Sequence, residues 1–112
     1  MSRKISQREM IKEVYKPLLV QGMDTTMHDE LVDITDHAIN EMIATLGRVT
    51  ESASNSYLIL QSTLLATAMG AERLKWISER CKELGEAALN GETDEEALRN
   101  IVNNAESIGS KS

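Results

Sequence analysis

The stretch 57-YLILQSTLLATAMGA-71 contains no charged residue and only a few polar ones. A helix that is apolar on most of its sides is buried on most of them. Its length and its Ser, Thr and Gln residues argue against a membrane span, which needs about 20 mostly apolar residues. Apolar and small residues continue at alternating three- and four-residue spacing beyond this stretch, at Tyr57, Leu60, Leu64, Ala68, Ala71, Leu74, Ile77, Cys81, Leu84 and Ala88.

This spacing predicts one long helix from about Ser54 to Leu89. The alternative is two helices with a turn at Gly70, because a glycine costs about 1 kcal/mol in a helix interior. The uncharged stretch has more apolar sides than the short helices around it can cover. We therefore expect a homodimer, with an interface at Tyr57, Leu60, Leu64, Ala68 and Ala71.

The composition favours helices throughout the chain. Aromatic residues make up 3% of the 112 residues, Phe is absent, and there is one Pro. An aliphatic core of Leu, Ile, Val, Ala and Met suits helix packing better than a sheet. We predict a single all-α domain over residues 1–112, a small bundle of four to five helices with one long central helix, and a frayed tail at 108–112.

Capping patterns predict the shorter helices. Ser6 with Glu9 predicts a helix start, and Pro17 should end or kink that helix near Lys16. Thr26 with Asp29 predicts the start of a second helix. Asn90 and Gly91 should close the long helix, and Thr93 with Glu96 should open a final one.

The net charge of −6 is unevenly distributed. Residues 1–22 carry +3 and residues 23–47 carry −6 with no Lys or Arg. On the predicted second helix, Glu30, Asp33, His37 and Glu41 fall on one side, whereas His28 falls toward the apolar side. We expect this acidic side either to dock a basic partner or to face Lys12 and Lys16 of the first helix.

Two other functions are possible for the charged residues. Carboxylate and imidazole groups at i, i+3 and i+4 can hold a divalent cation, so Glu30, Asp33, His37 and Glu41 could belong to a metal-dependent helical enzyme. Helical metal sites need ligands from facing helices, and no second set is evident, so we expect no metal or other cofactor. Arg3, Lys4, Arg8 and Lys12 could contact phosphates of a nucleic acid, but the acidic segment that follows opposes this.

The segment 72-ERLKWISERCKEL-84 predicts an ordinary solvated helix face, with ion pairs four residues apart between Lys75 and Glu79 and between Lys82 and Glu86. Trp76 on it is either packed under a neighbouring helix or exposed as an anchor for a partner. Cys81 is the only cysteine, which excludes an intrachain disulfide and indicates a half-buried thiol. There is no signal peptide, so we expect a cytoplasmic location.

These features favour a small cytoplasmic protein of bacterial or phage type that is not an enzyme. It would act as an adaptor, anti-activator, chaperone or inhibitor by binding another protein, and not a membrane. The expected partner-binding residues are Asp33, Asp36, His37, Glu41 and Trp76. A nucleic-acid-associated regulator is the alternative.

Overall fold

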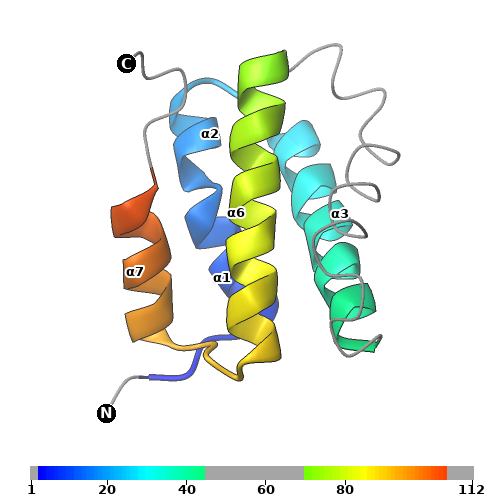
Figure 1. Ribbon diagram of the computed structural model, residues 1–112. Coiled ribbons are helices and arrows are strands. Elements are labelled where there is room, and N and C mark those ends of the chain that lie inside the picture. The colour runs from blue at the N-terminus through cyan, green and yellow to red at the C-terminus, as the bar shows by residue number, and fades with distance from the viewer. Residues whose placement is uncertain (1–2, 45–69, 106–112) are drawn as a thin grey trace.

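The computed structural model describes residues 3–44 and 70–105, and their regular elements are helices (Figure 1). These helices are α1 (Gln7–Val14), α2 (Lys16–Val20), α3 (Thr25–Ala44), α6 (Ala71–Leu89) and α7 (Glu95–Asn104). Helix α6 runs between α3 and α7, and α1 contacts all three of them. The all-α prediction is confirmed; the total number of helices and the single-domain prediction are not tested by these residues.

The first helix begins and ends as its sequence predicts. Ser6 Oγ accepts a hydrogen bond of 3.2 Å from the Glu9 amide, which satisfies one of the free N–H groups of the first turn. Helix α1 ends at Val14, and α2 begins at Lys16 with Pro17 in its first turn. Proline is tolerated there because the first-turn amides have no helical acceptor.

The caps predicted for α3 and α7 are wrong by one or two residues. Asp24, not Thr26, caps α3: its Oδ2 accepts from the amides of Thr26 at 3.0 Å and Met27 at 3.3 Å. Asp94, not Thr93, caps α7, since its Oδ1 accepts from the Ala97 amide at 2.9 Å. Asp competes well with Thr as an N-cap residue, and its charge also suits the positive end of the helix.

The predicted continuous helix through Gly70 is also wrong. Gly70 has φ +86° and ψ 161°, far from helical values, and α6 begins at the next residue. This positive φ is readily adopted by glycine alone, which explains the residue type at this position. Residues 54–69 of the predicted helix, and Tyr57, Leu60, Leu64 and Ala68 of the predicted dimer interface, lie outside the described residues, as does the tail at 108–112. Ala71 opens α6.

The segment before α1 pairs with the connection between α6 and α7. The Ile5 amide donates to the Thr93 carbonyl at 2.9 Å, and the Glu95 amide donates to the Arg3 carbonyl at 2.9 Å. These bonds flank an isolated antiparallel bridge between Lys4 and Asp94. Residues about 90 positions apart in the sequence are therefore held side by side.

Side chains from α1, α2, α3 and α6 meet in one core. Its largest fully buried apolar members are Tyr15, Met10, Ile11, Leu18, Leu31, Ile39, Ile77, Val32 and Cys81. At Gly85 of α6, any side chain would meet the methyl group of Met42 of α3. The predicted half-buried thiol of Cys81 is in fact fully buried.

The core also contains a small polar network. Tyr15 Oη and Thr35 Oγ1 are 2.9 Å apart, and both side chains are fully buried. His28 Nε2 lies 3.2 Å from the Tyr15 carbonyl oxygen, which confirms that His28 faces the interior. Each buried polar atom of this network thus has a partner, which avoids the cost of burying an unsatisfied group.

Candidate functional site

Two residues on the acidic side of α3 contact the first turn of α1. Asp33 forms an ion pair with Arg8, and this interaction is the main reason that the pKa of Arg8 is raised. Asp36 Oδ1 accepts a 2.8 Å hydrogen bond from Gln7 Nε2. The expectation that Lys12 and Lys16 would face this stripe is wrong, because Gln7 and Arg8 of the first turn of α1 occupy that position.

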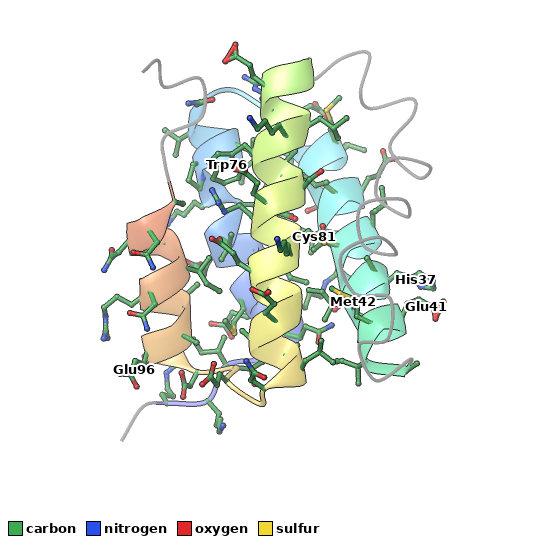
Figure 2. The ribbon with its side chains drawn as sticks, in the orientation of Figure 1. His37, Glu41, Met42, Trp76, Cys81 and Glu96 are labelled. Atoms are coloured by element: carbon green, nitrogen blue, oxygen red, sulfur yellow. The ribbon has the colours of Figure 1, made fainter. Side chains whose placement is uncertain are left out.

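Three other members of the stripe lie at the surface of α3. Glu30, His37 and Glu41 are exposed, and Figure 2 shows His37 and Glu41 on the side of α3 that faces away from α6. We call these three residues the outer α3 face. Within residues 3–44 and 70–105, no three His, Cys, Asp or Glu side chains come together as metal ligands.

The cations proposed for nucleic-acid contact are mostly engaged within the fold. Arg3 Nε lies 3.0 Å from Glu95 Oε2, Lys4 Nζ donates to the Gly91 carbonyl at 3.4 Å, and Arg8 pairs with Asp33. Lys12 is exposed on α1. Since three of these four cations have acceptors in the fold, they do not form one continuous basic face.

Trp76 is not an exposed anchor for a partner. It is buried on α6, and its ring lies 6.3 Å from that of Tyr15, centroid to centroid. The guanidinium carbon of Arg80 also lies close to this ring, 5.2 Å from the Trp76 centroid. The expectation that Trp76 packs inside is therefore confirmed, and the assignment of Trp76 to partner binding is wrong.

Arg80 is the unexpected residue of the charged segment, because only 6% of it is exposed. Its Nε donates to Glu83 Oε1 at 2.8 Å, whereas Nη2 lies 3.8 Å from Glu79 Oε1, beyond hydrogen-bonding distance. Nη1 is buried and has no hydrogen-bond partner in the described part of the chain. A buried guanidinium with one short hydrogen bond retains unused donor capacity.

Arg80 lines a groove between α6 and α7. One cavity of about 500 Å³ is lined by Glu79, Arg80, Lys82, Glu83, Glu86 and Asn104. A second cavity of about 260 Å³ shares Glu83, Glu86 and Asn104 and continues along Ala87, Asn90, Glu92, Ala97, Asn100 and Ile101. We call the two together the α6–α7 groove. Its size is within the range of sites that bind small molecules and short peptide segments.

No family model, curated protein or solved structure matches this chain. None of the described helices is both long and apolar enough to cross a membrane. The two surfaces with distinctive chemistry are the outer α3 face and the α6–α7 groove.

The α6–α7 groove is not evident from the sequence, because the charges of α6 have the spacing of a solvated helix face. The expected pairs joined Lys75 to Glu79 and Lys82 to Glu86, four residues apart. In the structure Arg80 instead takes both Glu79 and Glu83 as neighbours. The one available signal was the spacing of Trp76 and Arg80, since residues four apart on a helix can stack.

Proposed function

We propose that this chain is a small regulatory protein that binds a basic protein partner through the outer α3 face, and that it does so in the cytoplasm as an adaptor or inhibitor. The observation that supports the proposal is the one-signed charge of α3. Its 20 residues include five acidic side chains and no Lys or Arg. Among the described residues only Asp33 of these five forms an ion pair with a cation.

The field of such a helix suits a basic partner for a simple reason. Solubility alone is served by interspersed charges of both signs, whereas one-signed surfaces steer oppositely charged molecules. Glu30 and Glu41 are exposed, so their charges are available at the surface. The nucleic-acid alternative has weaker support, because Arg3, Lys4 and Arg8 have acceptors within the fold.

Charge reversal on the outer α3 face tests the proposal. A tagged variant with Glu30→Lys and Glu41→Lys should capture at least about tenfold less of the partner from the source cell than the unchanged protein does. The new lysines would repel the positive charges of the basic partner. Recovery is measured by affinity capture and quantitative mass spectrometry. The variant should keep its helicity and melting temperature, since both side chains are exposed.

The matched control is Glu13→Lys with Glu72→Lys, which makes the same change in net charge at exposed positions on α1 and α6. We expect this control to recover the partner as the unchanged protein does. Equal recovery by both double variants would show that the outer α3 face is not the docking surface.

We further propose that the protein is a homodimer. The support is the uncharged stretch 57–71, whose apolar side chains at Tyr57, Leu60, Leu64, Ala68 and Ala71 suit a symmetric interface. Light scattering should give twice the 12.4 kDa mass of the chain. Leu64→Glu, which would bury a charge at such an interface, should give the single-chain mass. A single-chain mass for the unchanged protein would contradict the proposal.

A further inference from the structure

We propose that the α6–α7 groove binds a basic polypeptide segment, whose main-chain carbonyl accepts from Arg80 and whose Lys or Arg side chains pair with the glutamates of the groove. This site lies on the other side of α6 from α3 (Figure 1) and does not depend on the function of the outer α3 face. Three properties of the groove point to this ligand: an unsatisfied buried donor, an excess of carboxylates, and carboxamides over an apolar floor.

The first property is the donor capacity of Arg80. A guanidinium has five N–H donors, and among the contacts of Arg80 with residues 3–44 and 70–105 only Nε–H makes a short hydrogen bond, to Glu83. Nη1 has no acceptor among the described residues, and leaving a buried donor unsatisfied is costly. Because Nη1 is buried, the proposed contact requires the guanidinium to shift toward the groove. The 3.8 Å contact with Glu79 is longer than a hydrogen bond and does not oppose such a shift strongly.

The second property decides the charge of the ligand. The groove is lined by Glu79, Glu83, Glu86 and Glu92 against Arg80 and Lys82. The positive charge of Arg80 is already balanced by Glu79 and Glu83 on either side of it. What Arg80 lacks is a hydrogen-bond acceptor for Nη1 among the described residues. A phosphate or a nucleic acid would meet the surplus carboxylates, whereas a neutral carbonyl oxygen would not. The surplus carboxylates instead favour a ligand with positive groups.

The third property favours a polypeptide over a simple cation. Asn90, Asn100 and Asn104 supply carboxamides, each able to donate to a peptide carbonyl and accept from a peptide N–H. Ala87, Ala97 and Ile101 form an apolar floor on which the stems of Lys or Arg can lie. A polyamine has positive groups but no acceptor for Arg80. A basic peptide has both in one chain.

Titration with defined probes tests this proposal directly. The probe is a capped octapeptide of alternating Lys and Ala, with a Glu–Ala octapeptide and spermine as comparisons. Isothermal calorimetry should show saturable binding of the Lys–Ala peptide, no binding of the Glu–Ala peptide, and weaker binding of spermine. Spermine binding as tightly as the Lys–Ala peptide would overturn the proposal, because charge alone would then account for it.

Variants then locate the binding. Glu86→Lys with Glu92→Lys should weaken binding of the Lys–Ala peptide by more than about tenfold, since two surface pairs are lost and two repulsions are added. Glu13→Lys with Glu72→Lys makes the same change in net charge away from the groove and should alter the dissociation constant by less than about twofold. Equal weakening in both variants would mean that binding follows net charge, and the groove would be excluded.

The role of Arg80 is read in the unchanged protein, because replacing a buried arginine can unfold the chain. In ¹⁵N-labelled protein, the guanidinium signals of Arg80 and the carboxamide signals of Asn100 and Asn104 should shift on saturation with the Lys–Ala peptide. Spermine should leave the Arg80 signals unchanged. Saturation with the peptide without a shift at Arg80 would show that the carbonyl contact does not form.

Discussion

Replacing Trp76 with Ala is expected to lower the free energy of unfolding by about 3–5 kcal/mol, the usual cost of removing a large buried aromatic side chain. Trp76 is 7% exposed, and its ring lies close to both the Tyr15 ring and the Arg80 guanidinium. Its removal leaves a cavity beside Tyr15 and takes away the aromatic face on which a buried cation rests. Such a loss is a large share of the stability of a typical small domain, about 5–15 kcal/mol.

The measurement is urea denaturation followed by far-ultraviolet circular dichroism, since Trp76 is the only tryptophan and fluorescence disappears with it. Val20→Ala is the matched control: Val20 is 80% exposed, and its truncation should change stability by less than about 0.5 kcal/mol. Trp76→Phe keeps part of the ring contact and should fall between the two. A loss below about 1 kcal/mol in Trp76→Ala would contradict the buried position of this side chain.

Alkaline pH is expected to destabilise the protein through Tyr15. Burial is the main cause that raises the pKa of Tyr15 well above its ordinary value of 10.0, with a further contribution from Cys81. The hydrogen bond to Thr35 and the charge of Arg80 oppose this rise. The folded state therefore holds the phenol proton at pH values where the unfolded chain has lost it.

The sign of the effect follows from this difference. Below about pH 10, Tyr15 is protonated in both the folded and the unfolded protein, so its contribution to stability is unaffected by pH. As the pH rises from there toward the higher pKa of the folded state, Tyr15 loses its proton only in the unfolded chain, and this progressively stabilises the unfolded state. The free energy of unfolding should then fall by about 1.4 kcal/mol per pH unit from this one group. Urea denaturation across this range in the unchanged protein and in Tyr15→Phe isolates the effect. Identical pH slopes in the two proteins would contradict it.

The helices themselves were largely predictable, because their start and stop residues act locally. Ser6 with Glu9 and the Pro17 interruption are visible in a few consecutive residues, and the structure follows them. The exact caps of α3 and α7 were not predictable in this way. Asp24 and Thr26, or Thr93 and Asp94, compete for the same role, and the choice depends on tertiary contacts such as the Ile5–Thr93 hydrogen bond.

The candidate site was only partly predictable for a related reason. The acidity of α3 is a property of sequence composition, but which carboxylates face α1 depends on the rotation of α3 about its axis. In the structure Asp33 and Asp36 contact Arg8 and Gln7 of α1, whereas Glu30 and Glu41 are exposed. Arg80 could not be found from composition, since its burial requires Trp76 and two glutamates of the same helix to surround it. The end of the predicted long helix at Gly70 was also not predictable, because the apolar residues keep their helical spacing on both sides of Gly70 although its backbone is not helical.

The pairing of the segment before α1 with the residues before α7 has a consequence for biosynthesis. A ribosome delivers the chain from its N-terminus, so α1, α2 and α3 can pack against one another while the rest is still being made. The hydrogen bond between Ile5 and Thr93 and the contact between α1 and α7 can form only after nearly the whole described chain has been translated. Contacts between such distant residues form late because closing a long loop is entropically costly. The part of the α1 surface that contacts α7 therefore stays uncovered during most of the synthesis of the chain.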